Sequence, residues 1–212
     1  MSSNDMVYIN WQKMIKPEKV QVSSKPAYGK FVCEPLERGF GITIGNTLRR
    51  IILSSLYGAA ITSVKFESVM HEFSVIPGVI EDVSEIILNL KEVRLKLKEL
   101  EPRTVYIDAK GEGVVKAGNI VSEDGRVEVL NPEQYIASLS EGAELKMTMN
   151  VDVGKGYALA EENRNDDASV GTIPIDAVFS PIKRVTYVVG NARVGQDTDY
   201  DKLTLEVWTD GS

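Results

Sequence analysis

The segment 37–58 constrains the fold more than any other part of the chain, because a glycine-rich stretch runs directly into an amphipathic helix. The three closely spaced glycines are Gly39, Gly41 and Gly45. They are expected to form a tight turn that brings the backbone close to the helix. The helix is predicted from about Thr43 or Gly45 to Tyr57, with Thr43 as its N-cap and Gly58 as its C-cap.

This predicted helix has two distinct faces at about 100° per residue. An apolar stripe suited to a core contains Ile44, Leu48, Ile51, Ile52 and Ser55. A second stripe on the opposite side contains Asn46, Arg50, Leu53 and Tyr57. The second stripe fits a partly solvated face with one exposed leucine. The alternative is a face that binds another protein, since Arg and Tyr are enriched at interface centres.

The composition is typical of a globular protein. The chain has 212 residues, of which 43% are hydrophobic, so it can bury a sizeable core without disulfides or metal. No apolar run approaches the roughly 20 residues that span a membrane, and the N-terminus has no secretory-signal pattern. The single Cys33 cannot form an internal disulfide, which fits a reducing cytoplasm.

Charge is distributed unevenly along the chain. The net charge is −7, which argues against a protein whose main partner is nucleic acid. Residues 1–70 carry nine Lys and Arg against five Asp and Glu, whereas residues 71–170 carry eleven against twenty. Residues 171–212 are close to balance, with four against six. The pattern predicts an α+β fold in which a strand-rich, acidic module is inserted into a unit made from both chain ends.

A second helix is predicted over residues 79–92, after the turn at Ile76-Pro77-Gly78. Its apolar positions are Val79, Val83, Ile86, Ile87 and Leu90. Leu88 lies off this face, either as an isolated exposed leucine or as a small contact patch. Strands are predicted at residues 19–23, 30–34, 60–66, 94–98, 104–109, 113–116, 126–130, 133–138, 144–153, 182–189 and 202–208.

Three patterns that often indicate chemistry are weak here. The glycine spacing G-x-G-x-x-x-G is one residue longer than the dinucleotide fingerprint, and no βαβ pattern surrounds it. We therefore favour a structural turn over a phosphate loop. The chain has one histidine, His71, and one cysteine, whereas a catalytic triad or zinc site normally needs more. We expect no catalytic residue, no metal and no cofactor in this chain.

Several long motifs resemble one family closely. They are Leu36-Glu37-Arg38-Gly39-Phe40-Gly41, Gly45-Asn46, Leu48-Arg49-Arg50-Ile51, Leu53-Ser54-Ser55, His71-Glu72-Phe73-Ser74, Glu81-Asp82-Val83, Glu85-Ile86, Leu88-Asn89-Leu90-Lys91, Gly154-Lys155-Gly156-Tyr157, Ser180-Pro181, Arg184-Val185, Ala192-Arg193-Val194 and Thr198-Asp199-Tyr200-Asp201-Lys202-Leu203. The chain is thereby similar, over about residues 15–210, to the N-terminal domain of the alpha subunit of bacterial DNA-directed RNA polymerase.

The resemblance implies a dimerisation subdomain, a sheet plus long helix, from residues 1–57 and 181–212, with an inserted subdomain at 58–180. It implies an assembly scaffold for a nucleotidyltransferase, with the active site in the large subunits and none in this chain. The implied partners are a second alpha subunit and the beta and beta-prime subunits. The implied location is the bacterial cytoplasm, in association with the nucleoid, with no membrane contact.

The resemblance also assigns docking residues. Arg50 and Leu53 match positions implicated in beta docking, and Asn46 extends that stripe. The positions that match beta-prime docking are Glu85, Lys91, Asp176, Ile182 and Lys202. The family's domain continues into a long helix that completes the dimer interface, and then into a C-terminal DNA-binding domain. We expect this chain, which ends at Ser212, to lack both, to dimerise weakly and to make no direct contact with nucleic acid.

Overall fold

The computed structural model describes residues 15–17, 19–165, 168–195 and 197–212, and the chain divides into two compact units. The first unit combines the chain up to residue 52 with residues 184–208, and the second combines 53–183 with 209–212. The described residues form mostly strands, with two α-helices, so the predicted α+β class is confirmed. Each unit is considered by itself below.

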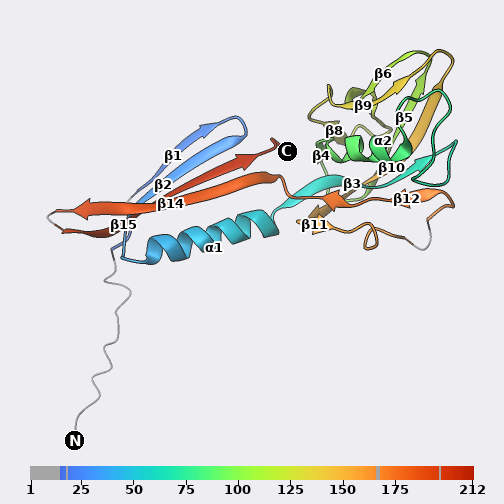
Figure 1. Ribbon diagram of the computed structural model, residues 1–212. Helices are drawn as coiled ribbons and strands as arrows, with labels where there is room; N and C mark the ends of the chain where they lie inside the picture. Colours follow the sequence, from blue (N-terminus) through green and yellow to red (C-terminus); the bar gives the residue numbers. More distant parts are fainter. Residues whose placement is uncertain (1–14, 18, 166–167, 196) are drawn as a thin grey trace, which may run out of the picture. The chain divides into compact units, whose positions relative to one another are not determined.

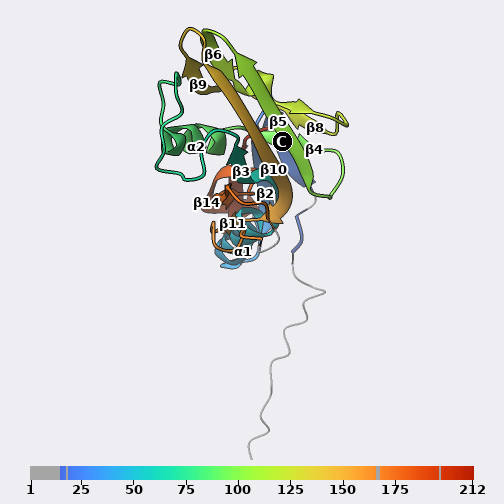
Figure 2. The ribbon, with the colours of Figure 1, turned by 90° about the vertical axis from the view of Figure 1, so that its right-hand side faces the viewer.

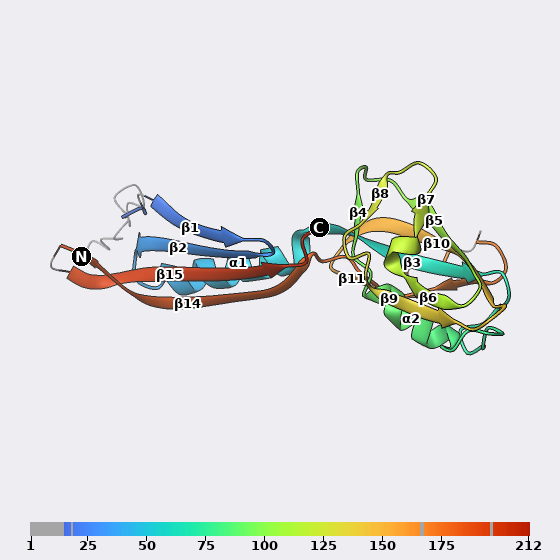
Figure 3. The same cartoon turned by 90° about the horizontal axis from the view of Figure 1, so that it is seen from above.

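The first unit contains a four-stranded sheet in the order β1-β2-β15-β14. The strands are β1 (Lys19–Lys25), β2 (Tyr28–Leu36), β14 (Ile182–Val194) and β15 (Asp197–Thr209). Figure 3 shows the sheet with α1 behind it. Val22 pairs with Phe31, and Phe31 pairs with Leu205, so the three side chains share one face. This apolar face is the one on which a helix can pack.

The long helix α1 (Phe40–Ser55) lies along one face of this sheet (Figure 1). Gly41 and Gly45 are its buried residues. A Cβ atom at Gly45 would lie only 2.6 Å from Cδ2 of Tyr187 on β14, and one at Gly41 would lie 2.8 Å from Cγ1 of Val189. The two glycines, four residues apart, therefore face the sheet and permit close packing of the helix backbone.

The predicted boundaries of this first helix are wrong at both ends. The helix begins at Phe40, so Thr43 is not its N-cap, and two of the supposed turn glycines are helical. Gly39 alone of the three has a positive φ, 86°. Gly58 is not a C-cap but lies in β3, where a Cβ would sit 1.8 Å from the carbonyl oxygen of Phe179. Gly58 is thus required by a close backbone approach inside the second unit.

The predicted core stripe of α1 is only partly buried. Ile44 and Ile52 are half-buried, whereas Leu48 is 37% exposed and Ile51 is 50% exposed. The physical reason is that the glycine pair, and not the centre of the apolar stripe, determines the line along which the helix meets the sheet. One apolar flank of α1 is left uncovered.

The second unit is built on a seven-stranded sheet in the order β7-β5-β10-β3-β4-β8, with β12 also paired to β3. Its strands are β3 (Tyr57–Phe66), β4 (Leu95–Leu97), β5 (Arg103–Lys110), β7 (Val121–Ser122), β8 (Val127–Val129), β10 (Glu144–Lys155) and β12 (Thr172–Pro174). Two small sheets pair β6 (Gly113–Lys116) with β9 (Tyr135–Leu139) and β11 (Tyr157–Ala158) with β13 (Ala177–Val178). The short 3-10 helix η2 (Ala117–Asn119) follows β6. Figure 2 shows the long strands β5 and β10 side by side.

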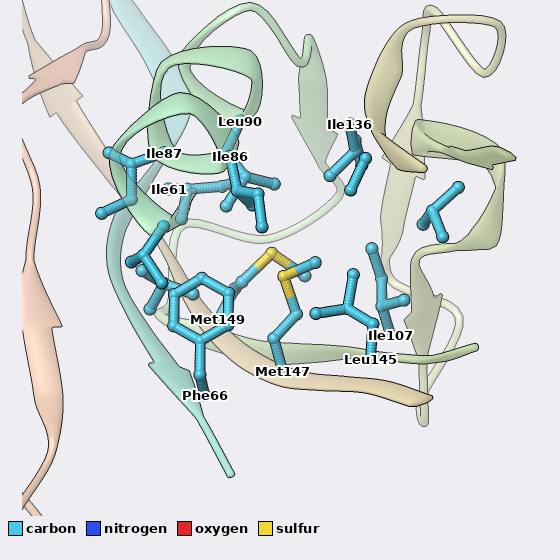
Figure 4. Close-up of a cluster of buried hydrophobic side chains, with 14 of the residues drawn as sticks. Ile61, Phe66, Ile86, Ile87, Leu90, Ile107, Ile136, Leu145, Met147 and Met149 are labelled. Atoms are coloured by element: carbon cyan, nitrogen blue, oxygen red, sulfur yellow. The ribbon is translucent and has the colours of Figure 1, made fainter. Parts of the chain in front are cut away.

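The helix α2 (Val83–Lys91) closes the core of this unit. Ile86, Ile87 and Leu90 point toward Met147 and Met149 of β10 (Figure 4). The prediction of these apolar positions is confirmed, but the helix begins four residues later than expected. Asp82 caps it, since its Oδ1 accepts from the backbone N–H of Glu85 at 2.7 Å. Val79 is buried in the preceding turn instead.

Candidate protein-docking sites

The second stripe of α1 lies on the exposed side of the helix. Asn46 and Arg50 are exposed, and Leu53 is 36% exposed. All three lie on the side away from the two glycines that pack on the sheet. Tyr57 does not belong to this stripe, because the helix ends at Ser55 and Tyr57 begins β3. There the Lys155 ammonium stands 4.4 Å from the centre of the Tyr57 ring.

The glycine-rich stretch that precedes and enters α1 already holds an anionic group from its own chain. Oδ2 of Asp201, on β15, accepts from the backbone N–H of Gly39 at 2.8 Å and of Gly41 at 3.0 Å. The first N–H groups of a helix need such acceptors and favour negative charge. The carboxylate of Asp201 therefore occupies the position that a phosphate would take in a phosphate-binding loop. This geometry supports a structural role for the glycines.

A polar cluster joins α2 to the segment before β13 in the second unit. Nζ of Lys91 lies 3.0 Å from Oδ2 of Asp176, and the two side chains are 29% and 32% exposed. The other carboxylate oxygen of Asp176 accepts from the backbone N–H of Ala160 at 2.9 Å. The hydroxyl of Tyr157 also donates to Asp176. The Asp176 carboxylate is thus bound by three groups from two parts of the chain, α2 and the segment 157–160.

These contacts change the acidity of the cluster. The Ala160 N–H, followed by the hydrogen bonds from Lys91 and Tyr157, lowers the pKa of Asp176 below its usual value. The pKa of Tyr157 is raised, chiefly because its hydroxyl donates to this carboxylate. Asp176 therefore stays ionised and keeps Lys91 in a defined position.

Lys91 and Asp176 line a cavity of about 400 Å³, together with Ile182 at the start of β14. Its floor includes apolar side chains of β3, α2 and β4, among them Ile61, Leu90 and Leu95. Arg94 also lines it and donates from Nη1 to the carbonyl of Asp210 at 3.2 Å. An apolar floor with a few placed charges is the usual composition of a site that receives a side chain or ligand.

The structure brings together three of the five residues predicted for beta-prime docking: Lys91, Asp176 and Ile182. Glu85 is exposed on α2, six residues before Lys91. Lys202 belongs to the first unit, where it is half-buried and its Nζ lies 2.9 Å from Oε2 of Glu34.

Sequence reasoning missed two residues of these sites, Tyr157 and Asp201. In the sequence Tyr157 stands out only as the end of the motif Gly154-Lys155-Gly156-Tyr157, and its partner Asp176 lies 19 residues further along the chain. Asp201 lies 160 residues from Gly41. Local periodicity carries no signal for contacts at such separations, although the motif that surrounds Asp201 had been singled out.

Metal binding and membrane crossing are two further properties on which the described residues bear. Across them, no group of three or more His, Cys, Asp or Glu side chains is placed to hold a metal ion. Their helices include none that is both long and apolar enough to cross a membrane. His71 is exposed before α2, and Cys33 is half-buried in β2 with its pKa raised by burial.

Comparison with known proteins accounts for most of the chain. Residues 64–180 match the RNA polymerase Rpb3/RpoA insert domain. A DNA-directed RNA polymerase subunit alpha of Desulfosudis oleivorans is 69% identical over 210 residues, or 99% of this chain and 62% of the relative. The same subunit of Desulforapulum autotrophicum is 66% identical over the whole chain and 62% of the relative. In Geobacter metallireducens it is 61% identical over 97% of the chain and 61% of the relative.

The second unit thus contains the insert domain shared by RNA polymerase subunits of the Rpb3/RpoA type. The chain belongs to the family of the alpha subunit of bacterial DNA-directed RNA polymerase, in its N-terminal domain, and the resemblance seen in the motifs is confirmed. The chain spans about six tenths of the length of these curated relatives.

Proposed function

We propose that the chain acts as an assembly scaffold of bacterial RNA polymerase, with no active site of its own. In this proposal residues 1–57 and 181–212 form the dimerisation subdomain, and residues 58–180 form the inserted subdomain. The observation that carries the proposal is the exposed polar stripe of α1, in a chain of the alpha-subunit family. A net charge of −7 favours protein partners over nucleic acid.

The beta subunit docks, in this proposal, on Asn46, Arg50 and Leu53. The support is their common exposed side of α1, opposite the glycines that pack on the sheet. Arg50 and the partly exposed Leu53 offer a charged contact beside an apolar one, and arginine is enriched at interface centres.

Replacing Arg50 with Ala should abolish capture of beta in a pull-down, since loss of a buried charged contact costs about 2–5 kcal/mol at an interface. Arg49→Ala is the matched control, because Arg49 is the neighbouring exposed arginine but lies about 100° away around the helix. Circular dichroism should be unchanged in both. If R50A captures beta as well as R49A does, the role given to Arg50 is wrong.

Beta-prime docks, in this proposal, on the cavity that contains Lys91, Asp176 and Ile182, with Glu85 and Lys202 as further contacts. The support is the charged pair over an apolar floor. Lys91→Glu should prevent beta-prime from joining a complex of the chain with beta, because two carboxylates would then face the partner. Lys96→Glu, at the exposed position of β4, should leave assembly intact.

Dimerisation through the first unit is supported by its uncovered apolar side chains. Ile51, Val20 and Val22 are 50%, 47% and 60% exposed. Burying one such side chain gains about 1.5–3 kcal/mol at most. Light scattering of this chain beside a version extended by the relatives' next segment tests the idea. We expect the extended chain to have the larger mass, and equal masses would contradict it.

A further inference from the structure

Beside α2, the second unit exposes apolar side chains that its core does not use. Phe73 is 87% exposed, Val75 68%, Ile80 72% and Leu88 61%. We call these four residues the Phe73 patch. Phe73, Val75 and Ile80 lie within seven residues of one another in the sequence, and Leu88 follows in α2. Isolated exposed apolar residues are common and need no explanation, whereas a group of them does.

The segment that carries Phe73 and Val75 is held against the start of α2. Val75 and Asp82 form an antiparallel bridge, and the N–H of Val83 donates to the carbonyl of Ser74 at 3.1 Å. The hydroxyl of Ser84 donates to the carbonyl of Glu72 at 2.8 Å. Since Leu88 follows Ser84 by one helical turn, it lies on the same side of α2 as this segment.

The outward direction of the patch is set by the core beneath it. Ile76 and Val79, between Val75 and Ile80, are 1% and 6% exposed and belong to the core cluster. Ile76 and Val79 therefore anchor the turn in the core, while the flanking Val75 and Ile80 are exposed. An anchored, ordered apolar surface loses little conformational entropy when it binds a partner.

The patch is continuous with the candidate beta-prime site and carries a single sign of charge. Leu88 stands three residues after Glu85 and three before Lys91, so the three share one exposed side of α2. Residues 72–90 contain four acidic residues and no lysine or arginine. Glu72 and Glu85, two of these acids, are exposed at the patch.

We propose that the beta-prime docking surface extends from the Lys91 cavity across α2 onto the Phe73 patch. The proposal rests on the proposed function, which assigns the cavity to beta-prime. The segment of beta-prime that binds here presents apolar or aromatic side chains to Phe73 and Leu88. Lysine or arginine residues surround them and complement the acidic border.

Titration of beta-prime onto a preformed complex of the chain with beta tests this proposal. The double variant Phe73→Ser/Leu88→Ser should bind beta-prime about tenfold more weakly or worse, because apolar anchors at the centre of a contact dominate affinity. Leu100→Ser is the matched control, since Leu100 is 78% exposed in the same unit but outside the patch. Glu72→Lys should weaken binding at low salt, and added salt should reduce the difference.

The outcomes separate this proposal from the one it rests on. If Lys91→Glu abolishes beta-prime binding while Phe73→Ser/Leu88→Ser binds within twofold of the unchanged chain, the extension to the patch is wrong and the cavity stands. If Lys91→Glu has no effect, both fail. Loss of beta capture or a change in dimer mass in the double variant would assign the patch to another partner and overturn the proposal. Matching urea midpoints for all variants show that folding is unaffected.

Discussion

The two α-helices that the described residues form lie in contrasting surroundings. In α2 the buried residues are Val83, Ile86, Ile87 and Leu90, which belong to a core cluster of 25 hydrophobic residues confined to the second unit. In α1 the buried residues are two glycines, although the helix is 16 residues long. Among the described residues, the buried apolar side chains of the first unit are Leu36, Val185, Ala192, Leu203, Leu205 and Val207.

The difference shows that the two units bury their apolar side chains in different ways. The second unit encloses its own core. The first unit packs one helix on one face of a sheet and leaves Ile51 and the β1 valines outside. Such a layer is covered on one side alone. Its remaining apolar side chains become buried when it binds another molecule. The contrast is therefore what we expect if the first unit is completed by assembly.

The largest predicted effect is the difference in stability between a core substitution in α2 and a substitution in α1. Leu90→Ala in α2 should cost about 2–5 kcal/mol, because Leu90 is 1% exposed and its removal leaves a cavity. Ile51→Ala in α1 should cost less than about 1 kcal/mol in the isolated chain, since half of that side chain is already exposed. Amide hydrogen exchange in each unit measures both. Equal losses of unfolding free energy in the two variants would contradict the contrast between the two helices.

Gly45→Ala tests whether α1 is held by the close approach of its backbone to the sheet. Alanine favours a helix by up to about 1 kcal/mol over glycine. The new Cβ would lie 2.6 Å from the Tyr187 ring, however, and overpacking costs about 1–3 kcal/mol. We expect a net loss of stability in urea unfolding. Gly190→Ala, where no atom lies within 4 Å, is the control and should be near neutral. A stabilised G45A would show that the packing is looser than the distances indicate.

Asp201→Ala should destabilise α1 by about 1 kcal/mol, within the range of lost helix caps. Two backbone N–H groups would lose their acceptor. Asp199→Ala removes only an exposed pair with Arg38, whose two side chains are 80% and 81% exposed, and should leave stability unchanged. Hydrogen exchange at the start of α1 distinguishes them. Equal protection in D201A and D199A would remove the role of Asp201.

The smallest predicted effect lies in the second unit and depends on pH. The lowered pKa of Asp176 means that its contribution to stability is present above the unfolded value of about 3.9. That contribution is lost as pH falls through the folded pKa. The variant Asp176→Asn should therefore have a lower free energy of unfolding than the unchanged chain near neutral pH. The difference between the two should shrink below about pH 4. We expect less than about 1 kcal/mol for a pair this exposed. A deficit that is constant down to pH 2 would contradict this.

Much of the fold could be predicted because local patterns and packing agree. The apolar positions of α2 were predicted from a period of 3.6, and all four within the helix are buried. Alternation in β10 likewise matches the burial of Leu145, Met147, Met149 and Val151. In α1 the helix was predicted correctly, but its apolar stripe is only partly buried, because Gly41 and Gly45 make the closest contact with the sheet. Periodicity reports where apolar side chains lie, whereas here glycines decide the contact.

The docking residues were predicted from motifs, and no contact in the structure tests those roles. The two α-helices, the longer strands, the α+β class and the family follow from the sequence alone, because they depend on short-range periodicity and contiguous motifs. The short strands β7, β11, β12 and β13 were not predicted. The start of α1 at Phe40, the cap from Asp201 and the pairing of Lys91 with Asp176 were decided only by the tertiary structure. The cap and the ion pair join groups distant in the chain, and their meeting depends on how the sheets bring the strands together. The exposure of Ile51 and of the Phe73 patch was decided in the same way, since burial depends on neighbours that no local pattern specifies.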